Sequence, residues 1–339
     1  MALIDIPLSV MLCCVLLLSF TLNLILIRFQ NRLPLLDIPN ERSSHTKITP
    51  RSGGIALFAS FLVGIFCSGY IDSLLFLIPV SFVFFVGLYD DMRPLSSKLK
   101  LFLTALPAVG LFHMGFSLEH FGTFFGKEIV LSYGFALLFF SFAISGFVSS
   151  LNLIDGLDGL ASVVSLAILL PFAYMGYKYT DLFLFSITLM LMSSIFGFLL
   201  LNWHPSKIFM GDSGSMFLGF MIAIIVVYAI KKEYITAISA LFLAGVPILD
   251  TLIVMLRRFL QGVHPFKADK THMHHLILNY HKSIPRTVFI LGLLQILFSY
   301  IGLGFKVRDD IFIFVLYALV FVLVYSLLTI SDKGYKENV

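Results

Sequence analysis

Acidic and amide side chains gather at the ends of long apolar runs, where they could bind a cation or a phosphate. Asn152, Asp155 and Asp158 are three residues apart, so on one continuous helix they would share about a third of its circumference. Gly156 lies among them, and a residue without a side chain lets a ligand or another backbone approach closely. Asp212 opens a further apolar run, where free backbone N–H groups favour anions and phosphate.

These groups offer oxygen ligands without cysteine, which is the preference of a hard cation such as Mg²⁺. That ion usually shares its coordination with substrate phosphates. The basic residues that would neutralise phosphate charge are Lys47, Arg51, Arg257 and Arg258. Together these parts suit phosphoryl or phosphosugar transfer, in which positioning and charge neutralisation supply most of the catalysis.

Each motif also has an ordinary interpretation. The pair Asp90-Asp91 at the end of an apolar run is, alone, typical of a solvated helix cap. The three histidines of segment 272–275 are compatible with a solvated loop, a zinc site or a substrate contact. Phe209 alone is more typical of a core anchor than of a ring that stacks on a base. The joint occurrence of these motifs on one side of the chain's apolar runs favours the functional interpretation.

The elements that must position these residues are membrane helices. Of 339 residues, 59% are hydrophobic and 12% are charged, about half the charged fraction of a soluble protein. Continuous apolarity without alternation predicts helices, because hydrocarbon tolerates no unpaired backbone groups. Soluble enzyme folds are excluded, and residues 1–339 form one all-α membrane domain. The eleven predicted spans lie near 6–28, 53–71, 73–89, 99–116, 131–150, 158–177, 181–201, 213–230, 234–256, 286–304 and 310–331.

The distribution of basic residues predicts the orientation of these spans. One set of polar breaks and the C-terminal tail carry 17 of the 23 Lys and Arg residues, and such a side is usually cytoplasmic. The N-terminus would then lie outside, and the candidate site would lie on the cytoplasmic face. The first apolar run is too long for a signal peptide. The odd number of cysteines implies no disulfide framework, and a net charge of +4 does not indicate nucleic acid.

In their order along the chain, the motifs resemble the polyprenyl-phosphate N-acetylhexosamine-1-phosphate transferases of the MraY/WecA type. The matching segments are 37–46, Asp90-Asp91, 152–159, 209–212 and 272–275. The resemblance implies transfer of a sugar 1-phosphate from a UDP-N-acetylhexosamine to undecaprenyl phosphate, with release of UMP and with Mg²⁺, or Mn²⁺, as cofactor. It also implies a bacterial inner-membrane protein that initiates a cell-envelope glycan such as O-antigen or teichoic acid.

The resemblance assigns roles residue by residue. Asn152 and Asp212 would hold the metal at the pyrophosphate. Asp90 and Asp91 would face the lipid phosphate. The positions that match the nucleotide pocket are Lys47, Gly156, Asp158, Asn202 and Phe209, with Phe209 stacked on uracil. The residues that would face the sugar and phosphates are His272, His274, His275, Arg257 and Arg258. The catalytic candidates are Asp90, Asp91, Asp155, Asp158 and the three histidines, with Arg51 as a further substrate contact.

One departure concerns Met273, because the peptidoglycan-precursor branch has three consecutive histidines in this box. This favours the WecA, TagO and WbpL types, with GlcNAc as the expected sugar and FucNAc or QuiNAc left open. The alternatives are a phospho-N-acetylmuramoyl-pentapeptide transferase and a nucleotide-sugar or lipid transporter. Asp250, inside a predicted span, would suit a transporter, but the other carboxylates cluster at the span ends and no inverted repeat is visible. Monomer or homodimer, and a one-step or two-step mechanism, stay open.

Overall fold

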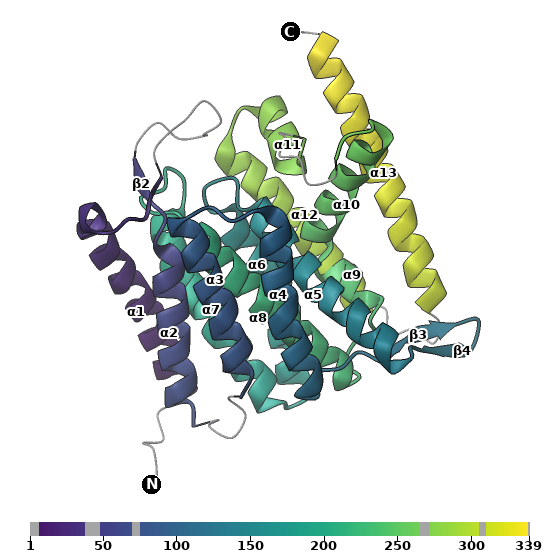
Figure 1. Cartoon of the computed structure of the whole chain (residues 1–339), viewed down its shortest axis with the longest axis horizontal. Coiled ribbons are helices and arrows are strands. Elements are labelled where there is room, and N and C mark those ends of the chain that lie inside the picture. Colours follow the sequence, from purple (N-terminus) through teal and green to yellow (C-terminus); the bar gives the residue numbers. More distant parts are fainter. Residues whose placement is uncertain (1–6, 38–47, 70–74, 265–270, 305–309, 338–339) are drawn as a thin grey trace.

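The computed structural model describes residues 7–37, 48–69, 75–264, 271–304 and 310–337, with side chains up to residue 329. Nearly all of this part of the chain is helical (Figure 1). The helices are α1 (Leu8–Arg28), α2 (Gly53–Cys67), α3 (Leu77–Met92), α4 (Ser97–His113), α5 (Tyr133–Ile154), α6 (Leu160–Lys178), α7 (Leu182–Asn202), α8 (Gly211–Lys231), α9 (Ser239–Leu243), α10 (Gly245–Leu260), α11 (Met273–His281), α12 (Ile284–Gly304) and α13 (Asp310–Glu337).

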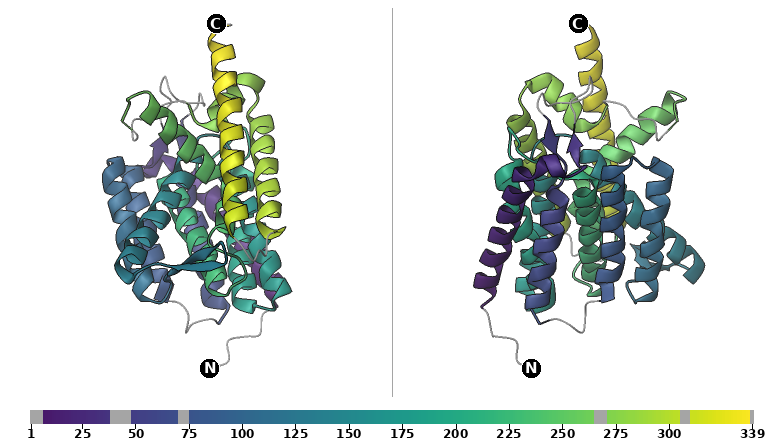
Figure 2. Two further views of the ribbon diagram at one scale, coloured as in Figure 1. Left: turned by 90° about the vertical axis from the view of Figure 1, so that its right-hand side faces the viewer. Right: turned by 60° about the vertical axis from the view of Figure 1, so that its left-hand side comes forward.

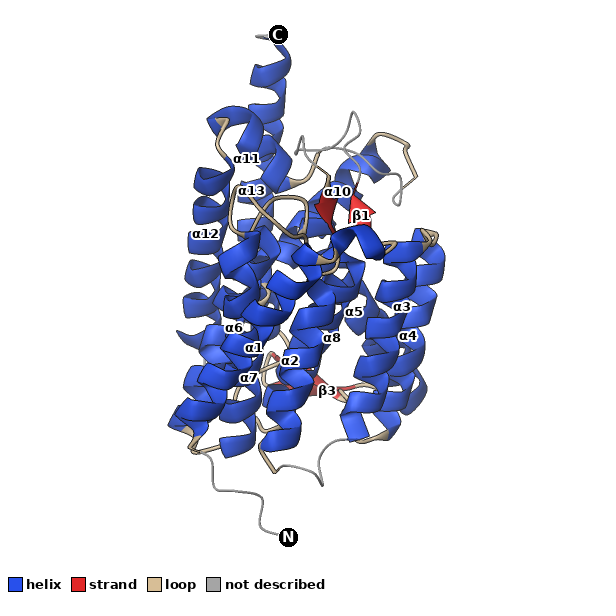
Figure 3. Ribbon diagram, turned by 90° about the vertical axis from the view of Figure 1, so that its left-hand side faces the viewer, coloured by secondary structure: helices blue, strands red, loops and turns tan. Residues whose placement is uncertain are grey.

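Seven of these helices are long and apolar enough to cross a membrane: α1, α5, α6, α7, α8, α12 and the Asp310–Thr329 part of α13. The prediction of an all-α, multi-pass membrane protein is therefore confirmed. The shorter helices α2, α3 and α4 run alongside them in the same bundle (Figure 3). The count of eleven spans stays a prediction.

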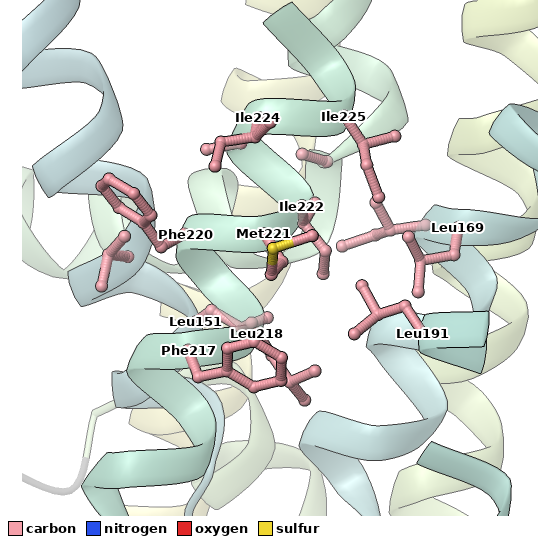
Figure 4. Packing of buried hydrophobic residues seen from close by; sticks show 14 of the residues in the cluster. Leu151, Leu169, Leu191, Phe217, Leu218, Phe220, Met221, Ile222, Ile224 and Ile225 are labelled. Carbon is pink, nitrogen blue, oxygen red and sulfur yellow. The ribbon is translucent and has the colours of Figure 1, made fainter. Parts of the chain in front are cut away.

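Helix α8 lies at the centre of the bundle and packs against α2, α3, α5 and α6. Beyond its first turns the helix is apolar on every side, and its side chains point in several directions, as Phe217, Phe220 and Ile225 show (Figure 4). A helix that is apolar all round is typical of such a buried position. Small residues let neighbouring helices come close. A Cβ at Gly87 of α3 would lie 2.5 Å from the carbonyl oxygen of Asp212, so this glycine brings the end of α3 onto the start of α8.

The apolar run predicted as one span over 234–256 is divided into α9 and α10 at Ala244. Pro247 has no N–H, so the carbonyl of Leu243 four residues earlier loses its helical partner. Gln295 of α12 fills the gap. Its Nε2 donates to the Leu243 carbonyl at 2.9 Å, and its Oε1 accepts from the Val246 N–H at 2.9 Å. One buried amide therefore satisfies both backbone groups at the break.

The two ends of the bundle differ in their loops (Figure 2). The upper end in Figure 1 carries α11, the last turns of α13 and a short ladder in which β1 (Leu36–Asp37) pairs antiparallel with β2 (Thr49–Pro50). The opposite end carries an antiparallel hairpin of β3 (His120–Phe124) and β4 (Lys127–Val130). The last turn of α3 and the first turn of α8 meet at the upper end, which is where the candidate site residues collect.

Candidate active site

Asp91 caps the first turn of α8. Its two carboxylate oxygens accept hydrogen bonds from the backbone N–H groups of Asp212 at 2.7 Å and Ser213 at 2.9 Å. The chain enters this turn through Gly211, whose φ of +71° lies in the left-handed region. A side chain there would collide with Asp91, since a Cβ would lie 2.7 Å from one carboxylate oxygen. Asp91 therefore fixes the place of Asp212.

Lys100 joins the two other carboxylates of this cluster. Its Nζ lies 2.6 Å from Asp212 Oδ2 and 3.0 Å from Asp90 Oδ2. Asp90 is buried, and its other oxygen accepts from the Leu95 N–H at 2.5 Å. Lys100 is absent from the residues predicted for the site. Its one signal in the sequence is a basic residue just inside the apolar run predicted over 99–116.

The segment that follows α5 is a turn and not a helix. The expectation that Asn152, Asp155 and Asp158 share one helix face is wrong, because α5 ends at Ile154. Gly159, the N-cap residue before α6, has a φ of +76°, a left-handed conformation that glycine adopts without the steric cost of a Cβ. The three polar side chains are therefore spread over a helix end and a turn.

Asp158 and Asn202 fasten the 203–209 loop to this turn. Asp158 accepts hydrogen bonds from Ser206 Oγ at 2.9 Å and Ser206 N at 3.2 Å, and it lies 2.7 Å from His204 Nδ1. Asn202 accepts from the Gly159 N–H at 3.0 Å and donates to the Ile208 carbonyl at 2.9 Å. Both residues, predicted as nucleotide contacts, thus shape the loop that leads to Phe209.

Asp155 faces a concentration of negative charge. Burial, together with the charges of Asp212, Asp91 and Asp158, raises the pKa of Asp155 well above its ordinary value of 3.8. Nearby on the last turn of α5, Asn152 donates through Nδ2 to Ser215 Oγ at 2.8 Å, which leaves its amide oxygen as a ligand atom. In the described part of the chain, no three His, Cys, Asp or Glu side chains are arranged to hold a metal ion by themselves.

The histidine box begins at the N-cap of α11. His272 Nδ1 lies 2.7 Å from Asp250 Oδ2, and Asp250 Oδ1 accepts from the Met273 N–H at 2.6 Å. Asp250, whose role the sequence left open, therefore contacts the histidine box directly. The Met273 side chain is buried in the apolar core.

His274 packs directly on the turn after α5. A Cβ at Gly156 would lie 2.5 Å from His274 Nε2, so only glycine admits the ring. The residue is 1% exposed, and neither ring nitrogen has a hydrogen-bond partner among the described residues. Burial, followed by the charge of His275, lowers the pKa of His274 to about 3. His274 is therefore a neutral ring with two unsatisfied nitrogens beside Gly156.

The adjacent arginines of α10 point to different neighbours. Arg257 donates through a terminal nitrogen to the Thr271 carbonyl at 3.3 Å, and its guanidinium lies 5.8 Å from the centre of the Tyr325 ring on α13. Arg258 lines the cavity beside the histidines. Both arginines were predicted to face the sugar and phosphates, whereas only Arg258 is among the residues that line this cavity.

A cavity of about 340 Å³ lies between α4, α5, α8, α10 and α11. Its polar lining consists of Ser97, Lys100, Thr104, Ser149, Asn152, Thr251, Arg258, His272, His274 and His275. Its apolar lining consists of Leu101, Phe142, Val148, Leu153, Met216, Val254 and Met255. A ligand in this cavity would therefore meet both polar or charged groups and hydrocarbon side chains.

The remaining predicted contacts lie apart from this cavity or outside the described residues. Arg51 forms an ion pair of 2.9 Å with Asp37, next to the β1–β2 ladder. The half-buried Phe209 pairs its backbone with the same segment, donating to the Pro50 carbonyl and accepting from the Gly53 N–H. Lys47 lies outside the described residues, as does most of segment 37–46.

A carboxylate–lysine cluster thus lies at the helix ends, beside a cavity with both polar and apolar lining residues. Such an arrangement is typical of membrane proteins that act on amphipathic substrates. Residues 73–230 match the model of glycosyl transferase family 4. A probable undecaprenyl-phosphate N-acetylglucosaminyl 1-phosphate transferase of Bacillus subtilis is 34% identical over 78% of this chain and 75% of the relative. The chain therefore belongs to glycosyl transferase family 4, as its motifs predict.

Two further relatives are both undecaprenyl-phosphate alpha-N-acetylglucosaminyl 1-phosphate transferases. The protein of Yersinia pestis is 28% identical over 80% of this chain and 77% of its own length. The protein of Escherichia coli K12 is 31% identical over 72% of this chain and 69% of its own length.

Proposed function

We propose that this protein transfers N-acetylglucosamine 1-phosphate from UDP-N-acetylglucosamine to undecaprenyl phosphate and releases UMP. Membership of the family and the names of the relatives support this reaction. The observation that carries it is Lys100, which lines the cavity and forms ion pairs with Asp90 and Asp212 behind it. The ammonium group of Lys100 and the neighbouring hydrogen-bond donors line a cavity that is large enough for a phosphate-bearing ligand.

The cavity linings suit a lipid phosphate. Lys100 and Arg258 offer positive charge to the phosphate, and the apolar residues of α5, α8 and α10 offer contacts to an isoprenoid chain. A second cavity of about 320 Å³, almost wholly apolar, lies along α5, α8, α9 and the start of α10; Phe147, Val226 and Ile248 are among its lining residues. Helices α5, α8 and α10 line both cavities and would thus provide room for more of the lipid.

The reaction forms one bond and breaks one. A lipid phosphate oxygen bonds to the sugar-linked phosphorus, and the bond from that phosphorus to the bridging oxygen breaks, so that UMP leaves. A phosphate monoester has a second pKa near 6 and is mostly a dianion at pH 7. The attack therefore requires alignment and charge neutralisation more than a strong base. In this scheme Asp90 acts by holding Lys100, and Asp91 acts by holding the turn that carries Asp212.

We propose Mg²⁺ as the cofactor, held by Asp212 and the amide oxygen of Asn152. Hard oxygen donors suit this ion, which typically uses one or two carboxylates together with substrate phosphates and rarely an all-protein cage. The Lys100 ammonium lies between Asp90 and Asp212, and this placement supports a position for positive charge beside Asp212. When bound, the ion would neutralise charge on the pyrophosphate.

We further propose that the protein lies in the bacterial inner membrane, with the site and the C-terminus on the cytoplasmic side and the N-terminus outside. The excess of Lys and Arg in the polar breaks at this end supports the orientation. A water-soluble nucleotide sugar would then reach the site directly from the cytoplasm.

The test is a transfer assay with the purified protein in lipid nanodiscs that contain undecaprenyl phosphate. We expect radiolabel from UDP-N-acetylglucosamine to appear in the lipid when Mg²⁺ is present and to disappear with EDTA. A parallel reaction with UDP-N-acetylmuramoyl-pentapeptide tests the peptidoglycan-precursor alternative. Uptake of labelled UDP-sugar into sealed vesicles, without a labelled lipid, would instead establish a transporter.

A further inference from the structure

Asp250 and His272 form a buried carboxylate–imidazole pair at the edge of the cavity. Asp250 is 1% exposed and His272 is 5% exposed, and Asp250 Oδ2 lies 2.7 Å from His272 Nδ1. His272 lines the cavity, whereas Asp250 lies behind it on α10. A ligand in the cavity would therefore meet the imidazole, with the carboxylate as its support.

The second oxygen of Asp250 makes this support rigid. It accepts from the Met273 N–H at 2.6 Å, so one carboxylate holds both the ring of His272 and the first turn of α11. The helix that carries Asp250 is itself held at its start, where Gln295 binds the Val246 N–H. Neither the carboxylate nor the ring can turn without breaking a buried hydrogen bond.

This arrangement determines which nitrogen of His272 faces a ligand as an acceptor. A carboxylate accepts hydrogen bonds and offers no proton when ionised, so the ring proton belongs on Nδ1. In this tautomer the neutral form of the ring would offer the lone pair of Nε2. Phosphate oxygens are also acceptors and find their donors in Lys100 and Arg258. An acceptor at His272 instead suits a hydroxyl or amide N–H group.

We propose that Asp250 is a positioning residue that presents Nε2 of His272 as a hydrogen-bond acceptor to the N-acetylhexosamine of the nucleotide sugar. The inference rests on the proposed function, because it assumes a sugar nucleotide in this cavity. It assigns to the buried Asp250–His272 pair the recognition of the sugar's own donor groups, apart from the diphosphate.

The test compares two ligands on the full-length protein by titration calorimetry in detergent with Mg²⁺. UDP-N-acetylglucosamine carries the sugar and UDP lacks it. In Asp250→Asn the introduced amide oxygen can still accept from the Met273 N–H. Its NH₂ group donates to His272 Nδ1, which moves the ring proton to Nε2 and abolishes the acceptor. We expect about tenfold weaker binding of UDP-N-acetylglucosamine and unchanged binding of UDP.

Asp181→Asn is the matched control. Asp181 also caps a helix, accepting from the Leu184 N–H at 2.9 Å, and also accepts from side chains, the hydroxyls of Tyr228 and Tyr234. It lies at the opposite end of the bundle, where α6 meets α7. The same chemical change there should leave the binding of both ligands as in the wild type.

A double substitution separates positioning from general damage. His272→Asn retains a donor toward Asp250 but removes Nε2, so it should weaken sugar-nucleotide binding by itself. If Asp250 acts through His272, adding Asp250→Asn to His272→Asn should cause no further loss, whereas independent effects would multiply.

Three results would overturn the inference. Asp250→Asn could bind both ligands like the wild type, it could weaken UDP and UDP-N-acetylglucosamine equally, or it could add a full further loss to His272→Asn. If UDP-N-acetylglucosamine gave no more heat with the wild-type protein than with buffer alone, the proposed function itself would be overturned, and this inference with it.

Discussion

Lys100 and Asp212 lie 112 positions apart in the chain, yet their side chains meet at 2.6 Å between α4 and α8. The same ammonium reaches Asp90 of α3, so three helices converge on one cation. Lysine here balances carboxylates that would otherwise repel one another and also faces the cavity. It is therefore both a structural link and a candidate phosphate contact.

Lys100→Met should lower the turnover of the transferase about 10²- to 10³-fold, because it removes a preorganised charge from the site of phosphoryl transfer. Lys98→Met is the control, since Lys98 is exposed on the same helix. Turnover is measured as labelled lipid formed per minute at saturating substrates. Wild-type turnover in Lys100→Met would remove this residue from the chemistry.

Asp91→Asn should destabilise the fold by about 1–3 kcal/mol, as expected when a buried donor loses its acceptor. An amide cannot accept from both backbone N–H groups of Asp212 and Ser213, because its NH₂ would point at one of them. Thermal unfolding followed by intrinsic fluorescence, alone and with UDP-N-acetylglucosamine, checks this. An unchanged melting temperature would show that the cap contributes nothing to stability.

Asp212→Asn should leave the protein folded and inserted but nearly inactive, because one anionic ligand is lost where pyrophosphate charge must be neutralised. The measurement is turnover as a function of Mg²⁺ concentration, with size-exclusion profiles as the test of folding. Normal activity with the usual Mg²⁺ dependence would contradict the assignment of Asp212 to the metal.

Asp155→Asn should raise the melting temperature at pH 7 without Mg²⁺. Because folding raises the pKa of Asp155, the folded state is favoured while this carboxyl is protonated. Stability then falls as the pH rises from the ordinary value of 3.8 through the raised value. One pKa unit corresponds to about 1.4 kcal/mol, which amounts to a few degrees. The gain in melting temperature should vanish below pH 3.8, where the Asp155 carboxyl is protonated and therefore as uncharged as the Asn amide. A gain that is independent of pH would point to another cause.

Arg257→Ala and Arg258→Ala should separate stability from function. Arg258 lines the cavity, so its loss should lower kcat/KM about 10- to 100-fold, as expected for a charge-assisted hydrogen bond to phosphate. Arg257 contacts Thr271 and Tyr325, so its loss should mainly lower the melting temperature. Kinetics and thermal unfolding of both variants, side by side, decide the matter. Equal kinetic losses would show that both arginines bind substrate.

The apolar runs predicted the long helices well, since a span must be continuous and apolar whatever its neighbours are. The break at Ala244 was not predicted. Pro247 is its local signal, but the side chain that satisfies the freed backbone groups, Gln295, lies about 50 residues further along the chain. Likewise the spacing of Asn152, Asp155 and Asp158 predicted one shared helix face, whereas α5 ends at Ile154 and the chain continues in a turn up to Gly159, the N-cap of α6.

Candidate site residues are easier to pick out in the sequence than the contacts that they make in the fold. Acidic pairs and glycine-flanked aspartates stand out in an apolar sequence. Whether a carboxylate meets a ligand or a backbone amide depends on how closely two helices approach, as Gly87 permits for α3 and α8. Asp91 and Asp158 show the difference, because backbone and side-chain donors of the protein engage their oxygens.

The amide of Gln295 also bears on how the protein is made. The ribosome completes α9 and α10 before it reaches α12, so the nascent chain enters the bilayer with the Leu243 carbonyl and the Val246 amide lacking their final partner. The half of the site that α10 carries, Asp250 and Arg258 included, can take its final direction only when α12 arrives. Assembly of this enzyme is therefore ordered. The side of the cavity that α10 forms reaches its final position last, once α12 has been synthesised.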